Sequence, residues 1–89
     1  MKSEQSWELR VSKDALKALA KIPKDHAEKI LEVVETLVVN PFVGDIKKIR
    51  GEDQTWRRRV GEYRILFELY QNEKIIFVFS IKRRSSNTY

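Results

Sequence analysis

The sequence predicts an α+β fold in which one β-sheet packs on two helices. Three observations support this class. The predicted elements follow the order strand, helix, helix and then three strands; tight turns connect the last three strands; and each helix carries a single apolar stripe. Because a chain of 89 residues buries one hydrophobic core, we expect a single domain over residues 1–89.

The N-terminal strand is predicted over residues 6–11, where apolar and polar side chains alternate. One face of this strand carries the apolar members, Trp7, Leu9 and Val11. Ser12 follows and is a typical N-cap for a helix over residues 13–21. The apolar stripe predicted for that helix consists of Leu16, Leu19 and Ile22.

Pro23 ends the first helix and is suited to the start of the next, which we expect from Lys24 to Val39. It ends at Asn40 because Pro41 disfavours the helical conformation of the residue before it. Its apolar face consists of Ala27, Ile30, Leu31, Val34, Leu37 and Val38. The joint between the helices is short, so we expect an antiparallel helical hairpin.

The second half of the chain predicts a three-stranded antiparallel meander over residues 55–60, 63–70 and 74–81. Between Gly44 and Gly51, residues 46–49 add a short extended piece. We expect core packing for the strand aromatics Trp7, Phe67, Phe77 and Phe79, and an exposed position for His26.

Positive charge is concentrated in one half of the chain. Residues 1–45 hold seven Lys/Arg against eight Asp/Glu, a balance of −1, and residues 46–89 hold eleven against five, a balance of +6. The sum is the net charge of +5. A one-sided positive field attracts polyanions, although many small domains are basic for solubility alone.

Several function classes are poorly supported. The chain has no cysteine and one histidine, so thiolate metal sites, cysteine proteases and Ser-His-Asp hydrolases lack their residues, and we expect no metal and no cofactor. No apolar run approaches the roughly 18–20 residues that span a bilayer, and the first ten residues lack a signal-peptide core. We therefore expect a cytoplasmic protein.

A group of arginines marks the candidate site. Arg57 and Arg59 lie two residues apart on a strand, so their guanidinium groups project in the same direction about 6.5–7 Å apart, a spacing that matches neighbouring RNA phosphates. Arg64 begins the next strand, while Arg83 and Tyr89 follow the last one. A solvated outer face is the plain alternative, but so dense a group of like charges is easier to explain if an anion binds there.

Arg58 has the opposite parity from its neighbours and shares its face with Trp56 and Val60, on the side predicted to be the core. An unpaired charge there is costly, so we expect Arg58 either to reach an edge of the sheet or to pair with a carboxylate such as Glu68.

In order along the chain, several segments resemble the RelE/ParE superfamily of bacterial and archaeal toxins, and in particular its RelE-like branch. The most specific is Trp56-Arg57-Arg58-Arg59-Val60-Gly61-Glu62-Tyr63-Arg64-Ile65-Leu66-Phe67; the others are Leu16-x-x-Leu19, Asn40-Pro41, Ile46-Lys47-Lys48-Ile49-Arg50-Gly51 and the closing Arg83…Tyr89. The resemblance covers nearly the whole chain. It implies the RelE-like fold and a ribosome-dependent mRNA endoribonuclease, an mRNA interferase that inhibits translation and is held inactive by a RelB-like antitoxin.

The resemblance also implies roles for single residues. In RelE-like enzymes the ribose 2′-OH attacks the adjacent phosphorus in the ribosomal A site without a metal. Arg57 and Arg59 match two basic strand residues that are often lysines, Arg64 matches the arginine that steadies the transition-state phosphate, and Arg83 matches one that neutralises the leaving oxygen. Tyr89 matches a tyrosine that stacks on the mRNA base. Further cations are candidates for RNA binding: Lys47, Lys48, Arg50, Lys82 and Arg84.

Two departures from the family pattern bear on mechanism. Arginine stays protonated at neutral pH and is unsuited to act as a general base, so either Tyr89 takes the proton or catalysis rests on positioning and charge. Arg58 stands where the family pattern has an apolar residue. Two other functions stay open: inhibition of DNA gyrase, as in the ParE branch, and a non-catalytic module that binds an antitoxin.

Overall fold

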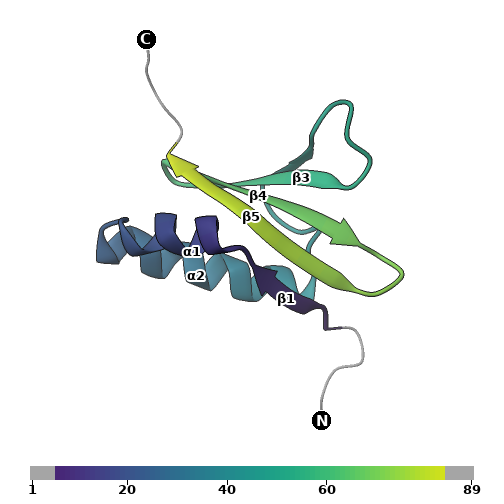
Figure 1. Ribbon diagram of the computed structural model, residues 1–89, viewed down its shortest axis with the longest axis horizontal. Helices are drawn as coiled ribbons and strands as arrows, with labels where there is room; N and C mark the ends of the chain where they lie inside the picture. Colours follow the sequence, from purple (N-terminus) through teal and green to yellow (C-terminus); the bar gives the residue numbers. More distant parts are fainter. Residues whose placement is uncertain (1–5, 84–89) are drawn as a thin grey trace.

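The structure, a computed structural model, describes residues 6–83 and contains two helices and one five-stranded sheet. The expected α+β class is confirmed, and each predicted boundary lies within two residues of the observed one. The helices lie together on one side of the sheet (Figure 1). The elements in chain order are β1 (Glu8–Val11), α1 (Lys13–Ala20), α2 (Lys24–Val39), β2 (Ile46–Lys48), β3 (Thr55–Val60), β4 (Tyr63–Tyr70) and β5 (Ile75–Arg83).

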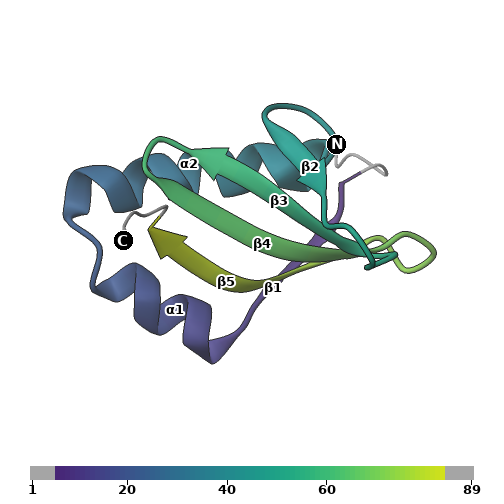
Figure 2. The ribbon, with the colours of Figure 1, turned by 90° about the horizontal axis from the view of Figure 1, so that it is seen from above.

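The sheet has the strand order β1-β5-β4-β3-β2. Strands β3, β4 and β5 form the predicted antiparallel meander, and β2 adds an antiparallel edge strand to β3. The N-terminal β1 pairs in parallel with β5, from Glu8 opposite Ile75 to Val11 opposite Val78. The first and last strands, β1 and β5, therefore form one side of the sheet, while β3 and β4 lie inside it (Figure 2).

The helix ends follow the sequence signals. The Ser12 hydroxyl accepts a hydrogen bond from the Ala15 N–H at 3.0 Å, which satisfies one of the free amides at the start of α1. Helix α2 begins directly after Pro23 and ends at Asn40, whose backbone is extended before Pro41.

The buried face of each helix differs slightly from the predicted one. Leu16 and Leu31, both expected in apolar stripes, are 52% and 47% exposed. The side chains of α1 that pack toward the sheet are Ala15, Ala18, Leu19 and, just beyond the helix, Ile22; those of α2 are Ile30, Val33, Val34 and Leu37. Both sets follow helical spacing. Each exposed leucine directly follows a buried residue, Ala15 or Ile30, so it points about 100° around the helix from the buried stripe.

The sheet buries one face only. Residues at alternating positions of β3, β4 and β5 join the core, including Phe67, which is fully buried as predicted. Trp7 also packs against this core. The expectation for Phe77 and Phe79 is wrong: both are partly exposed and neither belongs to the core. The inward positions of β5 are taken by Ile76, Val78 and Ile81, and a register shift between Leu66 and Phe67 leaves Phe79 without a direct partner on β4.

Candidate functional site

A row of three cations crosses the sheet on the face away from the helices, which we call the open face. Arg59 of β3 lies directly opposite Arg64 of β4, and Arg64 lies directly opposite Lys82 of β5. Directly opposed residues share a face, and the neighbouring pair Val60 and Tyr63 is buried on the helix side. Because strands lie about 4.8 Å apart, these three positions span about 10 Å. We call Arg59, Arg64 and Lys82 the basic row.

A second row, two residues before Arg59 in β3, extends this positive surface. Lys47 of the edge strand β2 lies opposite Arg57, which in turn lies opposite Leu66. Arg57 and Arg59 thus point from the same face, as their spacing predicted. The open face therefore gathers five cations at one end of the sheet: Lys47, Arg57, Arg59, Arg64 and Lys82.

Few of these charges are neutralised. Arg59 Nε lies 3.6 Å from Asp45 Oδ2, and within residues 6–83 this is the one ion pair that involves the five cations. The Nε atoms of Arg57 and Arg64 are shielded from solvent and have no hydrogen-bond partner among the described residues. Like charges directly opposite each other repel, so this face is arranged at a cost in stability. It is well suited to a bound anion with several acceptor oxygens.

Arg83 lies at the end of this surface but not in the basic row. Its register partner is Tyr63, a residue of the helix side, and its Nη2 donates to Glu62 Oε1 at 2.6 Å. The register position opposite Arg64 belongs to Lys82.

Two other predicted cations lie outside the five. Lys48 lies opposite Trp56, which packs against the core, so Lys48 faces the helix side. Arg50 lies in the turn between β2 and β3 and lines a small depression with Lys48 and Asp53. Arg84 and Tyr89 lie outside the described residues.

Arg58 is on the helix side of β3, as its parity predicted, but it does not pair with Glu68. Glu68 lies on the open face, where it accepts a hydrogen bond from the Tyr70 hydroxyl. The Arg58 guanidinium instead lies against Gly44 and donates from Nη1 to the Arg59 carbonyl oxygen at 2.6 Å. The sequence contained no sign of this contact, because it depends on the loop that precedes β2.

Sequence reasoning also missed two acidic residues. Asp45 and Glu62 hold Arg59 and Arg83, respectively. Glu62 has a signal in the sequence, since it is the carboxylate in the turn between the arginine-rich β3 and Arg64. Asp45 had no such signal, since it comes near Arg59 only when β2 pairs with β3.

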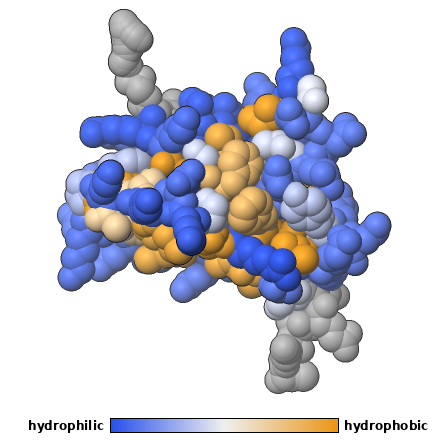
Figure 3. Space-filling view, viewed as in Figure 1, coloured by the Kyte–Doolittle hydropathy of each residue, from blue (hydrophilic) through white to orange (hydrophobic). Residues whose placement is uncertain are grey.

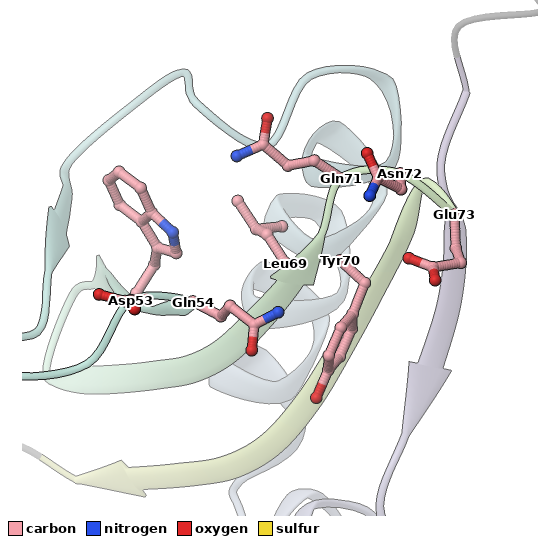
Figure 4. Close-up of a pocket in the computed structure, with 8 residues that line it drawn as sticks. Asp53, Gln54, Leu69, Tyr70, Gln71, Asn72 and Glu73 are labelled. Atoms are coloured by element: carbon pink, nitrogen blue, oxygen red, sulfur yellow. The ribbon is translucent and has the colours of Figure 1, made fainter.

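A depression of about 350 Å³ lies at the other end of the sheet, between the start of β3 and the turn after β4 (Figure 4). Its polar lining is acidic and amidic, with Asp53, Gln54, Gln71, Asn72 and Glu73 beside Trp56, Leu69 and Tyr70, and it contains no cation. Tyr70 extends from the end of β4 at its margin, and its hydrogen bond to the Glu68 carboxylate raises the pKa of the phenol. This end of the sheet is unsuited to a phosphate.

Within residues 6–83, no group of three or more His, Cys, Asp or Glu side chains is placed to hold a metal ion. In the same part of the chain, neither helix is long and apolar enough to cross a membrane.

Comparison with known families identifies the fold. The family model described as the ParE toxin of the type II toxin-antitoxin system, parDE, matches residues 9–88. The chain belongs to the RelE/ParE superfamily of toxins. Among its relatives, RelE1 from Methanocaldococcus jannaschii is 32% identical over 81 residues, which cover 88% of this chain and 90% of the relative. This places the protein with toxins of the RelE type.

Solved structures of the superfamily share the fold. The archaeal RelE–RelB complex from Pyrococcus horikoshii OT3 contains a chain with a TM-score of 0.82 and 26% identity, covering 92% of this chain and 99% of that one. The RelB–RelE complex from Methanococcus jannaschii has a TM-score of 0.71 and 28% identity, covering 84% and 89%. Isolated RelE from E. coli has a TM-score of 0.81 over 92% and 88% of the two chains, and at 18% identity it is a likeness of fold alone.

Proposed function

We propose that this protein is an mRNA interferase: a metal-independent endoribonuclease that cuts mRNA in the ribosomal A site and thereby inhibits translation. The observation that carries the proposal is the basic row, in which Arg64 stands between Arg59 and Lys82 with no carboxylate partner among the described residues. Because the proposed substrate is mRNA on ribosomes, the proposal also places the protein in the cytoplasm.

The chemistry requires charge stabilisation more than it requires a metal. The ribose 2′-OH attacks the adjacent phosphorus, the bond from phosphorus to the 5′-oxygen breaks, and the products are a 2′,3′-cyclic phosphate and a 5′-OH. Negative charge develops on the phosphorane oxygens and then on the leaving oxygen. Guanidinium groups fixed on a sheet stabilise these charges without reorganisation, and one well-placed cation of this kind contributes roughly 3–4 kcal/mol to lowering the barrier.

We assign Arg64 to the phosphorane oxygens because it lies at the centre of the basic row. Arg57 and Arg59 of β3 bind the flanking phosphates of the RNA. Arg83, whose register position lies on the helix side, has to reach the leaving oxygen from the end of β5, which requires its ion pair with Glu62 to open. The arginines of the open face act as electrostatic and hydrogen-bond partners, since arginine neither accepts a proton as a base nor releases one at neutral pH, and the leaving 5′-oxygen takes its proton from water. Tyr89 remains our candidate for the group that removes the proton from the 2′-OH.

The test is induction of the protein alone in cells, followed by primer extension on mRNA. We expect translation to stop and cuts to appear within translated codons. Arg64→Ala is expected to lower the cleavage rate about 10²–10³-fold. The matched control is Arg10→Ala, which removes an exposed strand arginine away from the basic row and is expected to leave cleavage unchanged.

A second candidate function is inhibition of DNA gyrase, because the matching family model is described as the ParE toxin. The same induction experiment separates the two functions. A block in DNA replication with intact mRNA favours the gyrase activity and contradicts the nuclease. Toxicity that persists in both Arg64→Ala and Arg83→Ala contradicts the catalytic assignment.

We also propose that a RelB-like antitoxin binds this protein, since the similar chains from P. horikoshii and M. jannaschii were solved as RelE–RelB complexes. Strand β5 continues past Val78, its last residue paired with β1, and runs to Arg83. There a groove of about 530 Å³ is lined by residues of α1, β4 and β5: the apolar Ala18, Leu66, Phe79 and Ile81, the polar Ser80, and the charged Asp14 and Lys82. Apolar side chains gather across the middle of this face of the molecule (Figure 3). An apolar segment with acidic residues suits the groove and the adjoining Lys82.

A further inference from the structure

Arg58 is a cation on the buried side of a strand, where an apolar side chain is the usual choice. It lies opposite Ile46 of β2 and Ile65 of β4, and Ile65 is fully buried. Its Nε is shielded from solvent without a partner among the described residues, while its Nη1 donates to the Arg59 carbonyl oxygen at 2.6 Å. A shielded guanidinium nitrogen without a hydrogen-bond partner costs free energy, so an arginine at this position calls for an explanation.

The Arg58 guanidinium lies against Gly44, which has no side chain to obstruct it. A Cβ added to Gly44 would lie 2.7–2.8 Å from the Nε, Cζ and Nη2 atoms of Arg58, so a side chain at position 44 would displace the guanidinium from its place. Gly44 also has φ +102°, a conformation that residues with a side chain rarely adopt. The backbone conformation favours glycine at position 44, and the absence of a Cβ there leaves room for the flat face of the Arg58 guanidinium.

The residue after Gly44 is the one that holds Arg59. The Asp45 carbonyl oxygen accepts from the Arg59 N–H at 3.0 Å, and its carboxylate lies 3.6 Å from Arg59 Nε. The Ile46 N–H donates to the Gly44 carbonyl oxygen at 2.9 Å, which closes the turn. The turn at residues 44–46 thus contacts Arg58 on the helix side and Arg59 through Asp45.

We propose that Arg58 is a positioning residue: by supporting the turn at residues 44–46 through the sheet, it fixes Asp45 and so sets the direction of the Arg59 guanidinium in the basic row. This inference rests on the proposed nuclease function for its effect on cleavage, but not for its effect on Arg59 itself. It gives a reason for an arginine at a position where the superfamily pattern has an apolar residue.

The first test observes Arg59 directly. In NMR spectra of the guanidinium Nε–H groups of the purified protein, Asp45→Asn defines the signal of Arg59 without its ion pair. Arg58→Met is expected to move the Arg59 signal to a similar position, and Arg58→Lys is expected to move it part of the way, because an ammonium group keeps the bond to the carbonyl but cannot lie flat on Gly44. Arg10→Met is the control and is expected to leave the Arg59 signal in place.

The second test measures cleavage of ribosome-bound mRNA. A displaced cation chiefly weakens transition-state binding, so Arg58→Met is expected to lower kcat about 10–100-fold with little change in KM. The double variant Arg58→Met/Asp45→Asn is expected to lose no more than the stronger single variant, because both act on the same group. If Arg58→Met does not fold, Arg58→Lys serves in both tests.

The outcomes separate the two proposals. An unchanged Arg59 signal in Arg58→Met and Arg58→Lys overturns the positioning role, even if the wild-type protein cuts mRNA. Multiplicative losses in the double variant overturn it as well. If the wild-type protein does not cut mRNA but the Arg59 signal responds as expected, the nuclease proposal fails and the positioning role stands.

Discussion

At the scale of single residues, Tyr70 and Glu68 show how one hydrogen bond sets the chemistry of a phenol. The Tyr70 hydroxyl donates to Glu68 Oε1, and this bond raises the pKa of Tyr70 above its ordinary value of 10.0, with burial and the charges of Glu68 and Glu73 acting in the same direction. Tyr70 therefore stays a neutral phenol at physiological pH. It is not a candidate base, although it lies on the same face of the sheet as Arg64.

We predict that Glu68→Gln lowers the pKa of Tyr70 toward 10.0, because the amide brings no negative charge to the phenol. An NMR titration of labelled tyrosines measures this change. The control is Glu73→Gln, which removes a weaker contribution and is expected to shift the pKa less. An equal response to both substitutions would show that general charge, and not the hydrogen bond, dominates.

The same residue pair predicts a pH dependence of stability. The folded-state pKa of Tyr70 is raised above the unfolded-state value, so the stabilisation is complete below that unfolded value, about 10, and is lost as the pH rises through the folded value. We expect a steeper alkaline loss of stability in the wild-type protein than in Glu68→Gln. Denaturant unfolding at several alkaline pH values measures the difference.

At the scale of elements, the basic row places like charges opposite each other across three strands. Such pairs are destabilising, so we predict that Arg64→Gln raises the free energy of unfolding by about 0.2–1 kcal/mol while it lowers cleavage. The gain is expected to shrink at high salt, where exposed charges are screened. Thermal unfolding of both proteins at low and high ionic strength checks this.

Arg64→Lys is the matched variant for that experiment, since it keeps the charge and changes the shape. It is expected to give little gain in stability. If Arg64→Lys and Arg64→Gln stabilise the protein equally, repulsion is not the cause, and relief of the shielded, unpartnered Nε explains the gain instead.

The sequence predicted which residues share a face but not which residues meet across strands. The period of two along β3 and β4 was enough to separate Arg57 and Arg59 from Arg58 and to place Arg64 on the open face. It was not enough to put Lys82, in place of Arg83, beside Arg64, because that register depends on the shift between Leu66 and Phe67. The contact of Arg58 with Gly44 also lies beyond periodicity, since a loop outside the strands makes it.

At the scale of the whole molecule, five cations from the basic half of the chain lie at one end of one face of the sheet. The meander supplies four of the five open-face cations, β2 supplies Lys47, and the helices cover the opposite side (Figure 2). A net charge of +5 alone would attract RNA to any side of the protein. The arrangement predicts that RNA binds the open face.

We predict that the affinity for unstructured single-stranded RNA falls with salt according to the number of open-face cations that contact phosphates. About four contacts give a slope of about −3 for the logarithm of the binding constant against the logarithm of salt concentration, and Lys47→Gln is expected to reduce that slope by about 0.7. Lys29→Gln removes the same charge from the exposed surface of α2 and is expected to leave the slope unchanged. Fluorescence anisotropy over a range of salt concentrations measures both. An equal reduction of the slope in the two variants would mean that RNA responds to the net charge of the protein and does not bind the open face in particular.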